Sequence, residues 1–144
     1  MKPTTILILE DSSDRIEAFE RAVRNLGVPW QLKIWHEAWS MIAEYEAYLP
    51  STALISLDHD LMPRGDVDID PGNGLQVASH LARRPPHCPV IIHTSNQVRR
   101  LMMHKEFLHA GWKTEFIVPA GIEWIEIEWI RKVRGLLNHR RPGV

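Results

Sequence analysis

The sequence predicts an α/β fold in which helices cover both faces of a parallel sheet. Short apolar runs alternate with amphipathic stretches along all 144 residues, a pattern typical of strand–helix–strand units. The apolar runs contain few polar residues, as do strands that are buried on both faces. The chain is long enough to bury a core without disulfides, so we expect one domain over residues 1–144.

Five strands and five helices are expected in alternation. The expected strands cover residues 4–9, 28–36, 52–57, 90–95 and 114–120, and the expected helices cover residues 14–26, 37–48, 74–83, 97–109 and 121–138.

The elements of the first half are predicted from apolar periodicity and from two residues that interrupt helices or strands, Gly27 and Pro29. "TTILIL" is uncharged and indicates a buried strand, and the next stretch places Ile16, Phe19 and Val23 on one helical face. Gly27 ends that helix, and Pro29 is tolerated near the start of "VPWQLKIWH", which alternates as an edge strand does. A second amphipathic stretch and the apolar run "TALISL" then give the second helix and the third strand.

The elements of the second half are set by turn residues. Asn73 and Gly74 mark the turn into the third helix after a long loop, and a cluster of prolines precedes the strand "VIIHTS". Gly111 ends the fourth helix, and "TEFIVPA" indicates the fifth strand. Asp66, Asp68 and Asp70 lack the glycine and glutamate of a calcium loop, so we interpret them as a solvated acidic turn, with a lid over the site as the alternative.

The last segment also alternates like a strand, but its length favours a helix over residues 121–138. The apolar residues that share one face of this helix are Ile122, Ile125, Trp129, Val133 and Leu136. Trp124 and Ile127 fall off that face, so we expect them to form an exposed apolar patch.

This order of elements predicts a flavodoxin-like doubly wound sheet with strand order 2-1-3-4-5, which binds ligands at the carboxyl ends of its strands. Polar residues follow three strands there: Glu10 and Asp11; Asp58, His59 and Asp60; and His93, Thr94, Ser95 and Asn96. Carboxylates from two strand ends make the oxygen site that Mg²⁺ prefers, and the ion in turn binds phosphate oxygens.

Composition excludes several classes of function. The net charge of −1 gives no global attraction to nucleic acid or membrane, and the single cysteine, Cys88, excludes an internal disulfide. The N-terminal apolar run is too short for a signal peptide or a membrane span, because charge returns at Glu10. We therefore expect a cytoplasmic protein with no DNA-binding domain.

These polar clusters resemble those of response-regulator receiver domains. In such domains an acid pair binds Mg²⁺, an aspartate after the third strand is phosphorylated, and a hydroxyl and a lysine bind the phosphoryl group. This chain has Val118 before Pro119, where a receiver has that lysine, and the turn after Asp58 is one residue longer. The resemblance implies a receiver scaffold without the positive partner of a phosphoryl group.

The segments "ISLDHDL" and "HTSN" resemble, more specifically, motifs of the cyclic-phosphate processing receiver domains. Members carry an acid pair with a nearby arginine, a Leu-Asp-His-Asp-Leu motif, and a His-Ser-x-Asn motif with arginine and methionine downstream. Here Glu10 stands where aspartate is usual, Arg15 lies slightly further on than the family's arginine, and Thr94 takes the serine position. The resemblance implies chemistry on cyclic phosphate ends of RNA or nucleotides.

The resemblance and the chemistry of ring opening together suggest roles. Metal ligands are expected among Glu10, Asp11, Asp58 and Asp60, with Mg²⁺ as the expected ion. Asp58, His59 and His93 are the candidate catalytic residues, with the two histidines as base and acid in either order. Thr94, Ser95, Asn96, Arg100 and Arg15 are the candidate phosphate-binding residues.

Two other functions stay open at this point. A signalling receiver phosphorylated on Asp58 would act through a changed affinity for its partner, although the missing lysine disfavours it. A degenerate receiver would act only as an interaction module. In each case the last two helices offer a surface for a homodimer.

Overall fold

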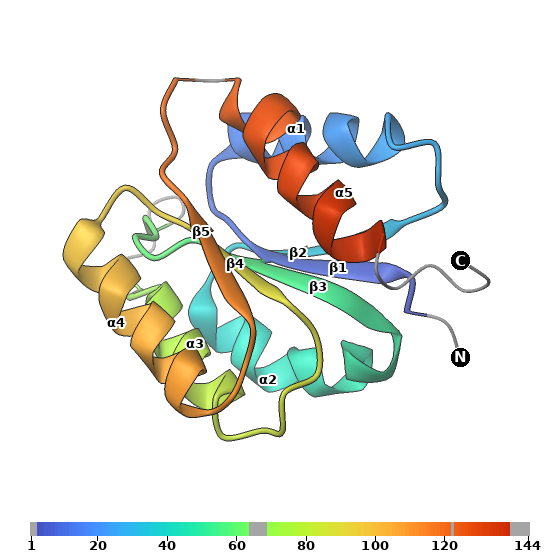
Figure 1. The fold of residues 1–144 in the computed structure, drawn as a ribbon. Helices are drawn as coiled ribbons and strands as arrows, with labels where there is room; N and C mark the ends of the chain where they lie inside the picture. The colour runs from blue at the N-terminus through green and yellow to red at the C-terminus, as the bar shows by residue number, and fades with distance from the viewer. Residues whose placement is uncertain (1–2, 64–68, 122, 139–144) are drawn as a thin grey trace.

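The computed structural model describes residues 3–63, 69–121 and 123–138. Its five strands form one parallel sheet in the order β2-β1-β3-β4-β5, as predicted, with β2 and β5 at the edges (Figure 1). The strands are β1 (Thr5–Leu9), β2 (Gln31–Trp35), β3 (Thr52–Leu57), β4 (Val90–His93) and β5 (Thr114–Ile117).

Helices follow the strands in the predicted order. They are α1 (Ser13–Arg24), α2 (Ala38–Tyr48), α3 (Gly74–Leu81), α4 (Gln97–His109) and α5 (Ile130–Asn138), with a 3-10 turn η1 (Leu49–Ser51) and a π-helical segment η2 (Ile125–Trp129). The first turn after α1 uses Gly27 at φ 70°, and α4 is followed by Gly111 at φ 85°, so both glycines end their helices as predicted.

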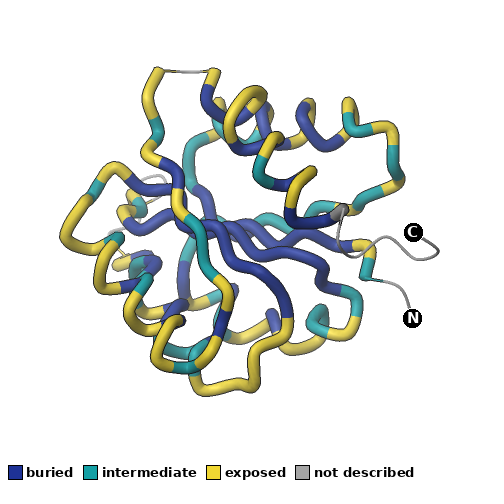
Figure 2. Tube along the Cα trace, viewed as in Figure 1, coloured by how far each residue is buried: buried dark blue, intermediate teal, exposed yellow. Residues whose placement is uncertain are grey.

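The sheet separates two apolar cores. Helices α1 and α5 cover one face, and α2, α3 and α4 cover the other (Figure 1). Along β1, Ile6 and Ile8 pack into the first core while Leu7 and Leu9 pack into the second, and the central strands are buried throughout (Figure 2). The residue parity within a strand therefore decides which helices its side chain meets.

The last helix begins differently from the prediction. Its first turn is π-helical, and Trp124 is only 3% exposed, so the expected exposed patch is wrong for this residue. Residues five apart fall on nearly the same side of a π-helix, whereas an α-helix separates them. Trp124 and Trp129 therefore both face the core, and both contact Phe19 edge-on. Ile127 remains 49% exposed, as expected.

The long loop after β3 is fastened back to the strand end. Asn73 caps α3 through a capping box with Gln76, and the Gly74 N–H donates to the His59 carbonyl at 3.0 Å. A Cβ atom on Gly74 would lie 1.9 Å from the Asp58 carbonyl oxygen, so only glycine permits this approach. The prediction for the acidic turn at Asp66 and Asp68 lies outside the described residues.

Candidate metal and phosphate site

Sheet register brings three ionisable side chains into one row. Leu9 pairs with Leu57, and Leu57 pairs with Ile92, so the next residue along each strand is Glu10, Asp58 or His93. All three side chains are buried, at 0%, 5% and 0% exposure. The predicted convergence of polar residues at the carboxyl edge of the sheet is thereby confirmed for these positions.

Glu10 is held from three sides. Its Oε2 atom accepts the N–H groups of Asp11 and Ser12, both at 3.1 Å. Its Oε1 atom lies 3.2 Å from His93 Nε2. Burial alone would raise the pKa of Glu10, but the hydrogen bond and charge of His93, with the Ser12 N–H and Arg15, outweigh burial and lower the pKa. Glu10 is therefore the ionised member of the row.

His93 lies within a buried chain of hydrogen bonds that continues to Glu10. Its Nδ1 atom lies 2.7 Å from Ser56 Oγ, and Ser56 Oγ also accepts the Trp129 indole N–H at 3.0 Å. The imidazole packs against Phe19 and Trp124, with ring centroids 5.4 and 5.6 Å away. Both ring nitrogens thus face protein groups, and the ring itself is fixed by aromatic contacts.

Asp58 carries the least compensated charge of the row. Its Oδ1 atom accepts the His59 N–H at 2.7 Å, while its Oδ2 atom has Arg15 Nη1 only at 3.7 Å. Burial, together with the neighbouring charge of Glu10, raises the pKa of Asp58 to about 7, although His93 and Arg15 oppose the rise. The free protein therefore has too little positive charge for both buried carboxylates.

The row has the donors of a metal site. Glu10, Asp58 and His93 each offer one ligand atom, and these atoms lie within 4.8 Å of one another. Ligands about 2.1 Å from one ion are about 3–4 Å apart, so a small contraction would bring all three onto an ion. The residues therefore fit a divalent cation, which would supply the charge that Arg15 does not.

His59 and Asp60 form a second unit beside the row. His59 Nδ1 lies 2.8 Å from Asp60 Oδ1, while His59 Nε2 is buried and has no hydrogen-bond partner among the described residues. A carboxylate on one ring nitrogen fixes the proton there and leaves the other nitrogen as an acceptor. The pair is thus arranged as an oriented base.

Two of the four predicted metal ligands, Asp11 and Asp60, are not members of the row. Asp11 Oδ2 accepts the Met62 N–H at 2.7 Å, so it fastens the loop after β3. Partial burial raises the pKa of Asp11, the Met62 N–H opposes that rise, and the neighbouring Glu10 carboxylate adds to it. Asp60 is largely exposed and is shared between His59 and the Asn96 amide, which donates to Asp60 Oδ2 at 3.5 Å.

Four of the five predicted phosphate-binding residues gather at the start of α4, whereas Arg15 lies on α1. Asn96 caps this helix by accepting the Arg99 N–H, and the buried Thr94 hydroxyl accepts the Asn96 N–H. Ser95 is exposed. Arg100 packs over Phe116 at 4.9 Å, and its buried Nε atom has no hydrogen-bond partner in the described part of the chain. This edge therefore offers a hydroxyl and a partly uncommitted guanidinium.

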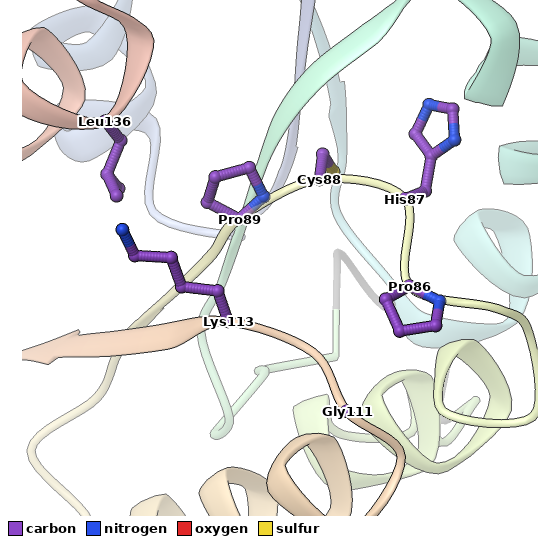
Figure 3. A pocket seen from close by; sticks show the side chains of 7 residues that line it. All are labelled: Pro86, His87, Cys88, Pro89, Gly111, Lys113 and Leu136. Atoms are coloured by element: carbon purple, nitrogen blue, oxygen red, sulfur yellow. The ribbon is translucent and has the colours of Figure 1, made fainter. Parts of the chain in front are cut away.

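The hollows of the surface differ in their relation to the row. A groove between α1 and η2 is lined by Arg15 and Trp124, and Arg15 stacks on the Trp124 ring at 5.5 Å. A pocket at the amino ends of β4 and β5 is lined by Pro86, His87, Cys88, Pro89, Gly111, Lys113 and Leu136 (Figure 3). Because the row follows the carboxyl ends of the strands, this pocket is not part of the site.

The geometry agrees with a match over most of the chain. The family model described as "Cyclic-phosphate processing Receiver domain" matches residues 6–109. The chain belongs to this family. The row of Glu10, Asp58 and His93 lies within the residues that the family model matches.

Solved receiver structures share the fold of this receiver domain. The phosphorylated cyanobacterial phytochrome response regulator RcpA aligns at 18% identity and a TM-score of 0.68, over 98% of this chain and 96% of its own. The Mn²⁺-bound response regulator Rcp1 aligns at 16% identity and a TM-score of 0.68, over 99% of this chain and 98% of its own. The CheX-CheY-BeF₃-Mg²⁺ complex from Borrelia burgdorferi aligns at 17% identity and a TM-score of 0.67, over 94% of this chain and 90% of its own. No curated protein matches the chain.

Sequence reasoning missed the residues that support His93. Ser56 interrupts the apolar residues of β3 two positions before Asp58, so strand parity places both on the α1 and α5 face. That parity was the available signal. Nothing in the α-helical period indicated Trp129 as its partner, because the π-helical turn changes which tryptophans face the sheet.

No helix in the described part of this receiver domain is long and apolar enough to span a membrane.

Proposed function

We propose that this receiver domain hydrolyses cyclic phosphodiesters, at RNA ends or in cyclic nucleotides, with the help of a divalent metal ion. The observation that carries the proposal is the combination of three buried ligand-bearing side chains with a neighbouring histidine whose Nε2 atom is uncommitted. A receiver that only accepts a phosphoryl group on aspartate needs no such base. The family name supports the same substrate class.

Glu10 and Asp58 would hold the metal ion through their carboxylates. When bound, the ion polarises a non-bridging phosphate oxygen and lowers the pKa of a water molecule. In the free protein, Asp58 Oδ2 has only the distant Arg15 as a counter-charge, 3.7 Å away. This unbalanced charge favours the binding of a cation.

His59 acts as the base in this proposal. Its Nε2 atom takes a proton from the attacking water, while Asp60 holds the Nδ1 proton and stabilises the resulting imidazolium. The water oxygen bonds to phosphorus, and one ring P–O bond breaks. The departing oxygen receives a proton from the imidazolium, so that a phosphate monoester and a free hydroxyl result.

The phosphate is expected to approach from the α4 side. The first turn of α4 contains no acidic residue and carries Arg100, and Ser95 presents its hydroxyl nearby. The groove between α1 and η2 is less suitable for an anion, because the acidic residues that line it, Asp14, Glu17, Glu123 and Glu126, outnumber its arginines. Arg15 would bind the phosphate from the opposite side of Asp58.

A signalling receiver is the second candidate, with an exposed apolar surface in its favour. Val98, Leu101 and Met102 on α4 are all at least 40% exposed, as is Phe116 on β5. Such a surface is typical of protein–protein contacts and could hold a second copy of the chain. Val118, in place of a receiver's lysine, disfavours phosphorylation of Asp58 as the trigger.

Phosphorus-31 NMR distinguishes these candidates. The protein is incubated with Mn²⁺ or Mg²⁺ and a 2′,3′-cyclic nucleotide, and separately with acetyl phosphate. We expect the cyclic resonance to convert to a monoester. His59→Gln should slow this conversion about 10²- to 10⁴-fold, the usual contribution of a general base, and leave metal binding unchanged. His109→Gln, at the exposed end of α4, is the matched control.

Each outcome bears on the proposal. Conversion that persists in Asp58→Asn and His59→Gln would contradict the assigned site. An acyl-phosphate signal with the cyclic ester untouched would favour the signalling receiver. No reaction in either tube would favour an interaction module.

A further inference from the structure

We propose that His93 is a metal ligand, and that it makes the site selective for a transition-metal ion such as Mn²⁺ or Zn²⁺ over Mg²⁺. The inference deepens the proposed function and depends on it for the presence of a metal. It replaces the all-oxygen site expected from the sequence with two carboxylates and one imidazole.

The position of the imidazole supports ligation. His93 Nε2 lies 3.2 Å from Glu10 Oε1, a separation typical of two ligands on one ion. Glu10, Asp58 and His93 each have a ligand atom within 4.8 Å of the other two, whereas Asp11 and Asp60 are bonded elsewhere. An ion at this row therefore meets a nitrogen as well as oxygens.

Ligand chemistry then decides the metal. Mg²⁺ prefers six oxygen ligands in an octahedral arrangement, while imidazole suits Zn²⁺ and other transition metals. Burial adds to this preference, because Glu10 and His93 are fully buried and leave little room for the several waters that Mg²⁺ retains. Mn²⁺ accepts both carboxylate and imidazole, and Zn²⁺ binds this donor set more tightly still.

Ser56 supports the tautomer that ligation needs. Ligation through Nε2 requires the His93 proton on Nδ1, which lies 2.7 Å from Ser56 Oγ. A hydroxyl oxygen has two acceptor sites, so it can accept this proton and the Trp129 indole N–H together. Before metal binds, the hydroxyl can instead donate to Nδ1 while Nε2–H donates to Glu10. Ser56 therefore satisfies His93 in both states, and Trp129 fixes the Ser56 oxygen.

This arrangement is a hydrogen-bonded second layer around a metal-binding histidine. Partners of this kind fix the ring orientation, and their removal typically lowers metal affinity about 10- to 100-fold. Ser56 and Trp129 are positioning residues in this sense. Their chain from the strand to η2 is buried throughout, so water does not easily replace a lost partner.

Calorimetry tests the selectivity. Mn²⁺, Zn²⁺ and Mg²⁺ are titrated into the wild-type chain, His93→Gln and Ser56→Ala, with His109→Gln as the exposed control. We expect His93→Gln to weaken Mn²⁺ and Zn²⁺ binding at least tenfold and to change Mg²⁺ binding by less than about threefold. Ser56→Ala should weaken Mn²⁺ binding about 10- to 100-fold.

Spectroscopy gives a readout that a structural defect would not imitate. Electron spin-echo envelope modulation of Mn²⁺ bound to the wild-type protein should show coupling to an imidazole nitrogen, and ¹⁵N-labelled histidine should shift that coupling. The measurement on the wild-type chain tests for an imidazole ligand even where His93→Gln fails to fold, and coupling that persists in His59→Gln assigns that ligand to His93.

Three results would overturn the inference: Mn²⁺ and Mg²⁺ binding with equal affinity, Mn²⁺ binding without nitrogen coupling, or no metal binding at all. The test is independent of turnover. Nitrogen-ligated Mn²⁺ with no hydrolysis would defeat the proposed function alone, whereas hydrolysis supported by Mg²⁺ and unaffected by His93→Gln would defeat this inference alone.

Discussion

Replacing Asp58 by asparagine should stabilise the metal-free protein. Folding raises the pKa of Asp58 from 3.8 to about 7, because the carboxylate is buried beside Glu10 with a distant arginine. Each pH unit of that rise corresponds to about 1.4 kcal/mol, so ionised Asp58 costs the folded state at most about 4 kcal/mol. Asparagine keeps an oxygen for the His59 N–H but carries no charge, and we expect a gain of about 2 kcal/mol at pH 8.

The size of this stabilisation depends on pH between the unfolded and the folded pKa of Asp58. Well below pH 4, Asp58 is protonated in both the folded and the unfolded state, so its charge does not affect stability and the two proteins should differ little. As the pH rises towards 7, the unfolded chain ionises first, and the wild-type protein loses stability relative to the variant. Above pH 7 the difference should stay constant.

Urea denaturation with a chelator at five pH values between 4 and 8 measures this difference. Glu106→Gln removes an exposed carboxylate on α4 and should change the unfolding free energy by less than about 0.5 kcal/mol at every pH. Adding Mn²⁺ should reverse the order, because only the wild-type row keeps both carboxylates. A variant that is less stable than the wild type at pH 8, or a pH-independent difference, would refute the reasoning.

Three further predictions concern packing and surfaces. Gly74→Ala should lower the unfolding free energy by about 3 kcal/mol in thermal denaturation, since its Cβ would overlap the Asp58 carbonyl; full stability would contradict the tight turn. Arg21→Ala should cost less than about 1 kcal/mol by urea denaturation, because the Arg21–Glu126 ion pair is exposed. Leu101→Glu should weaken any homodimer through α4 at least tenfold in sedimentation equilibrium, and an unchanged association would exclude that surface.

The order and type of the elements could be predicted because the signals are local. Alternation of apolar runs gave the strands, and Gly27, Asn73 and Gly111 marked helix ends through their own backbone preferences. The predicted strand order also placed Glu10, Asp58 and His93 at the carboxyl edge of the sheet. The predicted fourth and fifth strands extend past the observed ends of β4 and β5. Thr94 and Val118 follow those ends and are not part of the strands.

The contacts that each polar side chain of the site makes could not be predicted, because they depend on the tertiary structure. Asp60 was expected among the metal ligands, yet it holds His59 and receives the Asn96 amide from another loop. Trp124 was expected outside the core, since an α-helical period cannot indicate a π-helical turn. Only the folded chain decides which neighbour each polar atom meets.

The row of Glu10 and His93 joins residues 83 positions apart in the chain, with Asp58 between them. An unfolded chain scatters these donors, so it offers an ion no chelating site. Any ion that binds the row therefore binds the native state alone, and at a hundred times its dissociation constant it adds about 2.7 kcal/mol to stability. Metal supply would then govern how much of the protein survives proteolysis in the cell, before any question of turnover arises.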